Sequence, residues 1–390
     1  MALPVDSLTL APTDAGPDDI GSSLGSSMPG FAPLAMPAQS FKRFSRRERR
    51  ALVAPRLAAA PVLSRLFVFG GALALTAYGA VQMFKVVAIG TITPLEWAMV
   101  VLFVVTFSWV TLSLTSALLG FAWLLAHRGR REPPARLRER TAVVMPIYNE
   151  APSRVFGAMQ AIFEDVERTG QAHAFDFFLL SDTTDANVWI AEERAFAAMR
   201  ARLPQARLWY RRRRKNLGRK AGNIADFVTN WGGHYPHMVV LDADSLMTGE
   251  AIVGLAAAME TDPDAGIVQS QPLVINRNTM FARLQQFAAR MAGPVIGAGL
   301  SAWMGRDGNY WGHNAIIRTR AFADHCGLPD LPGKPPFGGH ILSHDFIEAG
   351  LMRRAGFTVY MLPDLGGSYE ESPPSLIDLA ARDRRWCQGN

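Results

Sequence analysis

Two long stretches without a charged residue constrain this chain more than any other feature of its sequence. Leu66–Phe84 holds nineteen residues and Trp97–Ala126 holds thirty, and neither contains Asp, Glu, Lys or Arg. A helix of about 20 apolar residues crosses the hydrocarbon core of a bilayer, which is about 30 Å thick. Two buried core helices are the alternative, but uncharged runs of this length favour spanning helices. We therefore expect transmembrane helices at 66–84 and 97–126.

Basic residues crowd the outer flanks of this pair. Eight Lys and Arg residues lie within 41–65 and six Arg residues within 127–140, whereas the connection 85–96 holds only Lys85. The positive-inside rule places such flanks in the cytoplasm. We therefore expect a basic cytoplasmic segment at 41–65, a periplasmic hairpin at 85–96 and a basic linker at 127–140.

The first forty residues have the composition of a flexible tail. Residues 1–40 are rich in Gly, Pro, Ser and Ala and show no sustained period, which is typical of a segment without a packed core. They lack the basic start, apolar run and cleavage site of a signal peptide. A flexible N-terminal tail is the expectation for 1–40.

Composition narrows the class of protein. Hydrophobic residues make up 49% of the 390 residues and charged residues 19%, so most of the chain is not disordered. The formal net charge of +6 fits nucleic acid, anionic lipid or a phosphorylated substrate equally well. The two cysteines, Cys326 and Cys387, have no zinc-ligand spacing and no disulfide framework, which favours a reducing compartment.

From Thr141 onward, short apolar runs alternate with amphipathic stretches. The expected strands are Thr141–Ile147, Phe175–Ser181, Arg207–Arg211, Met238–Asp242, Gly266–Gln271 and Trp311–Arg318. The expected helices are a segment from Pro152 through Val166, and Ala186–Arg202, Arg219–Trp231 and Ala251–Thr261. This alternation implies an α/β domain with a mostly parallel central sheet flanked by helices. Ligands of such domains lie at the carboxyl ends of the strands.

Three carboxylates follow expected strands. Asp242 and Asp244 leave one apolar strand together, and side chains two apart in an extended chain point the same way. Such a pair is a hard-oxygen site for Mg²⁺ or Mn²⁺, or else a polar turn with a helix cap. Asp182 ends the preceding apolar run. It can accept hydrogen bonds from a nucleobase or ribose, or it can cap the next helix.

A basic run, Arg211–Lys215, leads into an expected helix that carries Lys220 near its start. A lysine at a helix N-terminus can meet a diphosphate. The alternatives are a solvated charge cluster and a nucleic-acid patch. Nucleic acid is not expected as a partner, because interleaved surface aromatics and a known binding module are not evident.

Two further features carry chemistry in the last fifty residues. Asp345 lies at the start of an expected helix, where it can take a proton from a sugar hydroxyl or cap the helix. Arg382 and Arg385 lie three apart, on one helical face, and can clamp a pyrophosphate. Trp386 offers a flat apolar surface to a sugar. We expect an interfacial helix at 373–390.

The order of these features resembles the membrane-embedded family 2 glycosyltransferases, the group that includes the cellulose and hyaluronan synthases. That order is an Asp after the second strand, Lys-Ala-Gly-Asn, Asp-x-Asp, a later Asp and a final Arg-Trp. The segments that carry the resemblance are Tyr210–Phe227, Val239–Gly249, Tyr310–Arg318, Ile341–Phe357 and Gly367–Asn390. The resemblance extends from about Lys42 to the end and is more specific than Asp-x-Asp alone.

The resemblance implies a GT-A-like catalytic domain at 141–372 that transfers glucose from UDP-glucose, with inversion, to a growing β-1,2-linked glucan of the osmoregulated periplasmic type. It implies a multi-pass protein of the bacterial inner membrane, with the catalytic domain in the cytoplasm. It also implies the lipid bilayer, a glucan acceptor, glucan-export proteins and acyl carrier protein as partners. Members of the family continue into further transmembrane helices, so the chain looks like a fragment without the export path.

The resemblance also assigns roles to residues through the matched motifs. It implies that Asp182 binds the uridine, Lys220 the diphosphate, Asp242 the nucleotide and the metal, and Asp244 the metal. It implies that Asp345 is the base and that Arg382 and Arg385 bind the leaving group. It implies that the acceptor is bound by Trp386, His313 and Asn314. The implied metal is Mg²⁺, and Mn²⁺ also suits an oxygen-only site.

Three departures from the broader pattern accompany the resemblance. The family motif Thr-Glu-Asp reads Ser343-His344-Asp345 in this chain, so His344 replaces Glu. Arg382 replaces the Gln of the family motif Gln-x-x-Arg-Trp. Thr183 follows Asp182 at the position where the family has a second Asp. Two alternatives stay open. One is another processive family 2 transferase with a cellulose-like or polyprenyl-phosphate acceptor. The other, less favoured, is a non-catalytic membrane-anchored binding module that holds anionic partners through Arg211–Lys215.

Overall fold

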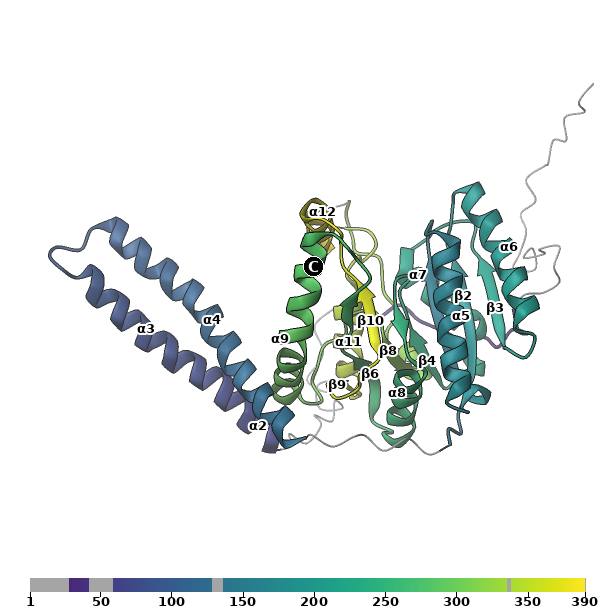
Figure 1. Ribbon diagram of the computed structural model, residues 1–390, viewed down its shortest axis with the longest axis horizontal. Helices are drawn as coiled ribbons and strands as arrows, with labels where there is room; N and C mark the ends of the chain where they lie inside the picture. The colour runs from purple at the N-terminus through teal and green to yellow at the C-terminus, as the bar shows by residue number, and fades with distance from the viewer. Residues whose placement is uncertain (1–27, 42–58, 128–135, 335–337, 390) are drawn as a thin grey trace, which may run out of the picture.

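A computed structural model describes residues 28–41, 59–127, 136–334 and 338–389. The predicted basic segments therefore lie mostly outside the described residues, as do positions 1–27 of the predicted tail. The rest of the chain forms a long helical hairpin and an α/β domain, which Figure 1 shows side by side.

The hairpin consists of two long apolar helical runs. The first joins α2 (Ala59–Arg65), a π-helical turn η1 (Leu66–Gly70) and α3 (Gly71–Val87). The second is α4 (Pro94–Ala126), whose start is fixed by a capping box between Thr93 and Glu96. Both runs, 61–87 and 94–126, are long and apolar enough to cross a membrane. They include the two predicted spans.

The hairpin buries three threonine side chains between its helices and exposes many apolar ones. Thr76 and Thr111 share a hydrogen bond of 2.8 Å between the helices, and Thr115 donates to the Val68 carbonyl at the π-helical turn. On the outer surface, Leu73 is 71% exposed and Trp109 is 69% exposed. A large exposed apolar surface marks an interaction site, and satisfied polar groups between helices are typical of packing in lipid.

The α/β domain is built on a seven-stranded sheet with the order β3-β2-β1-β4-β8-β6-β9. The strands are β1 (Thr141–Ile147), β2 (Phe175–Ser181), β3 (Leu208–Arg212), β4 (His237–Val240), β6 (Ala265–Ser270), β8 (Ala315–Arg318) and β9 (Thr358–Leu362). Only β8 runs against its two neighbours, β4 and β6. The predicted α/β class, with a mostly parallel sheet, is confirmed.

Helices cover both faces of this sheet because its strands are apolar on both sides. In β1, Val143 and Met145 face one core, whereas Ala142 and Val144 face the other. The first core is closed by α5 (Pro152–Arg168), α6 (Ala186–Arg202) and α8 (Gly249–Thr261), and the second by α7 (Arg219–Trp231), α10 (Thr319–His325) and α11 (His344–Arg354). The 3₁₀ turns η2 (Ala172–Ala174) and η3 (Gly232–His234) lead into β2 and β4.

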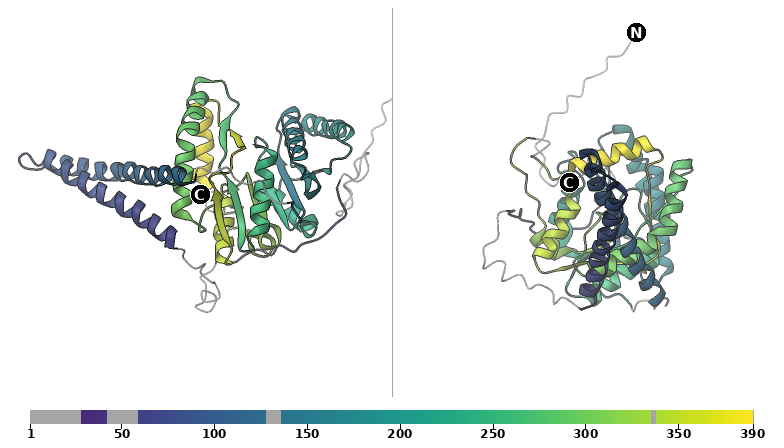
Figure 2. Two further views of the ribbon diagram at one scale, coloured as in Figure 1. Left: turned by 60° about the horizontal axis from the view of Figure 1, so that its bottom comes forward. Right: turned by 90° about the vertical axis from the view of Figure 1, so that its left-hand side faces the viewer.

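A second, smaller sheet and two further helices complete the domain, and one of these helices packs against the hairpin. The sheet has the order β5-β10-β7, formed by Leu246–Met247, Ser368–Glu371 and Leu273–Ile275. The helices are α9 (Met280–Met304) and α12 (Leu376–Gly389). Figures 1 and 2 show α9 between the hairpin and the large sheet. Here α4 and α9 touch backbone to backbone: a Cβ on Gly120 would lie 2.0 Å from the Val295 carbonyl oxygen and 2.6 Å from the Gly299 nitrogen.

Residues 28–41, most of them from the segment predicted to be a flexible tail, pack against the α/β domain. This segment, the N-terminal strap, runs over the second core: Leu34 donates to the Thr229 carbonyl of α7, and Gln39 donates to the Gly327 carbonyl after α10. Met28 and Leu34 are buried in that core. Apolar side chains at irregular spacing anchor the strap, so the absence of a period did not mean the absence of packing.

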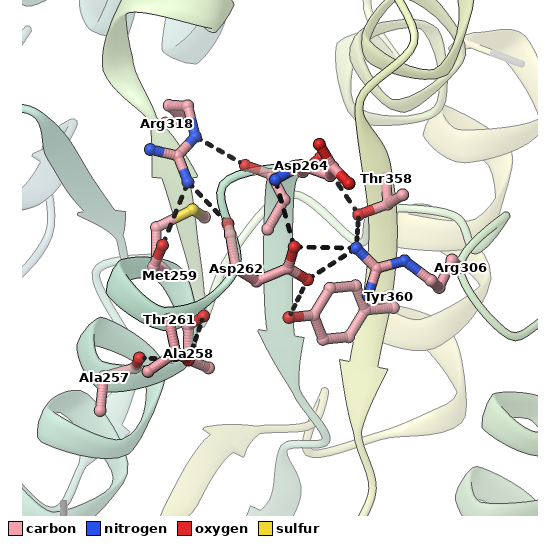
Figure 3. Close-up of polar contacts among 11 residues, drawn as sticks. Ala257, Ala258, Met259, Thr261, Asp262, Asp264, Arg306, Arg318, Thr358 and Tyr360 are labelled. Atoms are coloured by element: carbon pink, nitrogen blue, oxygen red, sulfur yellow. Dashed lines mark hydrogen bonds and ion pairs between the residues drawn. The ribbon is translucent and has the colours of Figure 1, made fainter. Parts of the chain in front are cut away.

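Two arginines hold the turn between α8 and β6 at the end of the sheet that is remote from the strand carboxyl ends (Figure 3). Arg318 donates to the main-chain carbonyls of Met259, Asp262 and Ala265 at 3.1, 2.8 and 2.9 Å. Arg306 instead pairs with the Asp262 side chain at 2.7 Å and is 47% exposed.

Replacing Arg318 with methionine should lower the free energy of unfolding by about 1–3 kcal/mol, because it leaves partly buried helix-end carbonyls without their donor. Arg306→Met is the matched control, and an exposed ion pair should cost at most about 1 kcal/mol. Thermal and denaturant unfolding of both variants measures the difference. Equal losses would contradict the prediction.

Candidate active site

A cavity of about 700 Å³ lies at the carboxyl ends of β1, β2 and β4. Its charged lining residues are Glu150, Arg154, Asp182, Arg219, Lys220, Asp242, Asp244 and Arg277. This is where the topology of an open parallel sheet places a ligand. The structure brings four of the predicted site residues together here: Asp182, Lys220, Asp242 and Asp244.

Asp182 follows β2 and is held by an ion pair with Arg213. The Arg213 Nε and Nη2 atoms donate to the two carboxylate oxygens at 2.7 and 2.6 Å. Arg213 directly follows β3, which pairs in parallel with β2, so the two strands end side by side. Asp182 is only 3% exposed. It therefore presents a fixed hydrogen-bond acceptor to the cavity.

A buried carboxylate supports the turn after β2. Glu192 of α6 accepts hydrogen bonds from Ser181 at 2.7 Å, Thr183 at 2.6 Å and Tyr210 at 2.9 Å. Burial and the charge of Glu192 raise the pKa of the Tyr210 hydroxyl. Thr183 thus has a structural reason to replace the more usual Asp, because its hydroxyl anchors the turn that presents Asp182.

Lys220 lies in the first turn of α7 and reaches the Asp-x-Asp motif. Its ammonium forms an ion pair with Asp242 and donates to the Gly312 carbonyl at 2.7 Å. Burial alone would raise the pKa of Asp242, but Lys220 and other cations lower it. Gly218 and Arg219 have φ angles of 66° and 51°, which bend the chain so that α7 starts at the cavity. A non-glycine residue in this conformation is strained, and such strain is concentrated at functional sites.

Asp244 lies two residues further on, and burial together with the charge of Asp242 raises its pKa. The two side chains supply hard oxygen donors. Among the residues that the structure describes, no group of three or more His, Cys, Asp and Glu is arranged to hold a metal ion. The donor set fits Mg²⁺ or Mn²⁺ with a shell completed by phosphate oxygens and water, rather than a closed protein cage.

Asp345 lies in the first turn of α11, next to the Lys220–Asp242 pair but outside the cavity lining. A Cβ on Gly312 would lie 3.4 Å from Asp345 Oδ2, and the Gly312 carbonyl binds Lys220. Behind Asp345, His344 Nδ1 lies 3.0 Å from Glu348. Burial would lower the pKa of His344, but Glu348 raises it above its ordinary value.

His313 and Asn314 both contact β10. His313 Nε2 lies 3.2 Å from the Glu370 carboxylate. Asn314 is fully buried and donates to Ser368 at 2.9 Å, so its amide supports the strand. Gly312 and Asn314 have φ angles of 89° and 49°. The positive φ angles of these two residues are incompatible with an extended strand, which is why β8 starts only at Ala315 and not at Trp311 as expected.

Two of the predicted site residues on α12, Arg382 and Trp386, lie apart from the cavity. The Arg382 guanidinium stacks on the Trp386 ring at 4.4 Å, and Trp386 is 54% exposed. Neither residue lines the cavity. Arg385 lies on the same helix, but its side chain is outside the described residues.

Sequence reasoning missed several residues of the cavity, among them Tyr148, Glu150, Arg154 and Arg277. Tyr148 and Glu150 directly follow β1, so the rule that found Asp182 and Asp242 would have found them as well. Burial raises the pKa of Glu150. Arg154 and Arg277 come from α5 and from the loop after β7, where no strand-end pattern marks them. Both bind Glu371, at 2.6 and 2.5 Å.

Residues 237–390, from β4 to the end, match the family model "Glycosyl transferase family group 2". The chain is similar to "Glucans biosynthesis glucosyltransferase H" of Shewanella sp. (strain ANA-3), with 53% identity over 368 residues. The protein of the same name from Shewanella oneidensis is 52% identical. Each match covers 94% of this chain and 51% of the relative, so the chain spans about half the length of these relatives. The resemblance inferred from the motifs is confirmed.

Solved structures of two transferases are also similar. The mannosyltransferase PcManGT from Pyrobaculum calidifontis, in complex with GDP-Man and Mn²⁺, has a TM-score of 0.44 and 17% identity, and the match covers 70% of this chain and 69% of that one. GalNAc-T7 with UDP, GalNAc and Mn²⁺ has a TM-score of 0.41 and 14% identity, and the match covers 64% of this chain and 48% of that one.

Proposed function

We propose that this chain transfers glucose from UDP-glucose to a growing β-1,2-linked glucan. One observation carries the proposal: the cavity collects Asp182, the Lys220–Asp242 pair and Asp244 at one edge of the sheet. A fixed acceptor, a cation and two oxygen donors are the groups that a nucleoside diphosphate and its metal require. The printed names of the relatives support glucose as the sugar and a glucan as the product.

The reaction is a single inverting displacement in a GT-A-like domain. Asp182 binds the uridine, and Lys220 turns from Asp242 to the diphosphate. Asp345 takes the proton of an acceptor hydroxyl while its oxygen attacks the anomeric carbon. The bond to UDP breaks on the opposite face, and Lys220 stabilises the charge on the leaving group. His313 orients the acceptor. Arg382 and Trp386 lie apart from the cavity, so α12 would have to move for Arg382 and Arg385 to assist at the diphosphate and for Trp386 to meet the acceptor.

Metal binding is part of this proposal. A bound Mg²⁺ or Mn²⁺ would act as a Lewis acid for the departing diphosphate. Asp244 would hold it, and Asp242 would contribute a second oxygen once Lys220 has turned away.

We further propose that the hairpin spans the bacterial inner membrane with the α/β domain on the cytoplasmic side. The exposed apolar surfaces of α3 and α4 support this arrangement, and so does the basic composition of the flanks. The lipid bilayer is then a permanent partner of the chain.

The arginine run does not favour a binding module for anionic partners. Arg211 is 2% exposed and pairs with Asp226, Arg212 stacks on Trp189 at 4.4 Å, and Arg213 binds Asp182. Three of the five charges of the run therefore have partners within the chain, which favours the transferase.

Isothermal titration of the detergent-solubilised chain with UDP and UDP-glucose, with and without Mg²⁺, tests the nucleotide site. We expect binding that Mg²⁺ strengthens. Labelled glucose from UDP-glucose should then appear in a polymer whose linkage analysis gives 1,2-linked residues. Another linkage would indicate a different family 2 transferase, and affinity that ignores Mg²⁺ but falls steeply with salt would indicate the binding module.

A further inference from the structure

We propose that Arg213 is a positioning residue that makes the nucleotide site selective for uracil. The inference rests on the proposed function, because it takes Asp182 as the contact to the nucleotide base. Arg213 itself does not line the cavity. It acts through Asp182 and through the loop that carries Lys220.

The Arg213 guanidinium is bonded through all three of its nitrogens. Nε and Nη2 hold Asp182, as described above, and Nη1 donates to the Gly222 carbonyl at 2.9 Å. Nη2 also approaches the carbonyls of Leu217 and Arg219 at 3.2 and 3.4 Å. One side chain, only 14% exposed, therefore joins the end of β2 to the turn that starts α7. Arg213 therefore positions both Asp182, the proposed contact to the nucleoside, and the turn that carries Lys220, the proposed contact to the diphosphate.

The two-point contact fixes both the orientation and the hydrogen-bonding character of Asp182. A carboxylate held by both oxygens cannot rotate, and its remaining lone pairs can only accept. Uracil presents an N3–H donor to such a group, whereas the N3 of cytosine is itself an acceptor. With uracil, the carboxylate receives a hydrogen bond. With cytosine, two acceptors would face each other, so the site discriminates strongly between the two bases. Arg213 thus ensures that Asp182 can only accept a hydrogen bond from the base.

The neighbouring residue provides a matched control. Arg212, the last residue of β3, carries the same charge, but its guanidinium lies over the Trp189 ring at 4.4 Å. Arg212→Met therefore removes one positive charge near the site without touching Asp182. Arg213→Lys keeps the charge but cannot donate from two fixed nitrogens.

The test is titration of the detergent-solubilised chain, in the presence of Mg²⁺, with UDP and with CDP. In Arg213→Met, the Kd for UDP should rise at least about tenfold, and the preference for UDP over CDP should fall at least about tenfold. Arg213→Lys should restore part of both, and Arg212→Met should match the unaltered chain. Asp182→Asn, whose amide can donate to the cytosine N3, should shift the preference towards CDP.

The ratio of the two affinities separates positioning from folding, because a smaller folded fraction lowers the number of sites and leaves the ratio unchanged. An unchanged UDP-to-CDP ratio in Arg213→Met would overturn the inference while leaving the proposed function intact. Failure of the unaltered chain to bind UDP would overturn the proposed function and the inference together.

Discussion

Asp345→Asn should lower the rate of glucose transfer about 10³-fold while the Kd for UDP stays within about twofold, because proton transfer by a positioned base contributes about 10²–10⁴-fold. The amide has the shape of the carboxylate but cannot take a proton. The residue does not line the nucleotide cavity; it lies beside Gly312, whose carbonyl binds Lys220. UDP binding should therefore survive.

Radiolabelled transfer and titration on the same preparation measure the two quantities. Asp264→Asn is the control, since it makes the same change at the opposite end of the sheet (Figure 3) and should leave both unaffected. Loss of UDP binding in Asp345→Asn would place the residue in the nucleotide site and remove it as the base.

Asp244→Ala should abolish the effect of Mg²⁺ on UDP binding and reduce transfer by at least about 100-fold, because the charge on the departing diphosphate loses its main electrostatic support. The remaining affinity should come from Asp182 and Lys220 and should not respond to the metal. Titration with UDP over a range of Mg²⁺ concentrations measures this directly.

Asp185→Asn provides the control for Asp244→Ala. Asp185 caps α6 by accepting from Asn187 at 2.8 Å, and Asn is an equally good cap. The substitution removes a carboxylate at the same end of the sheet without touching the cavity lining. Metal-dependent UDP binding that persists in Asp244→Ala would rule out this residue as the metal ligand.

The sequence predicted the parts of the fold whose local pattern agrees with their final environment. β1 and β2 are apolar at nearly every position and lie between two layers of helices, so their predicted bounds match the structure. The same agreement holds for α6 and α7. In these elements, local periodicity and burial give the same answer.

Prediction failed where contacts distant in sequence decide the conformation. α9 contains Pro294 and several glycines, which normally argue against a helix, but these small residues allow its close contact with α4. β7 and β10 are short and partly polar and exist because they pair with each other. The N-terminal strap is held by contacts with α7, α10 and the second core, and its own sequence contains no pattern that predicts these contacts.

The candidate site was predictable to the extent that its residues follow strands. Asp182, Asp242 and Asp244 were found in this way, and Lys220 through its place at a helix start. Arg213 was visible only as one charge in a basic run. The sequence could not separate its role from those of Arg211 and Arg212, because which carboxylate or ring each arginine meets depends on elements elsewhere in the chain.

The glycine crossing between α4 and α9 has a mechanical consequence. Where Gly120 meets Gly299 the two helices are in backbone contact, so we expect a displacement of one helix to be passed to the other. Arg65 adds a second link, because it donates to the Trp303 and Met304 carbonyls at the far end of α9. That end leads directly into the loop that holds His313. We therefore expect a change in the tilt of the hairpin to be carried by α9 to the loop that holds His313.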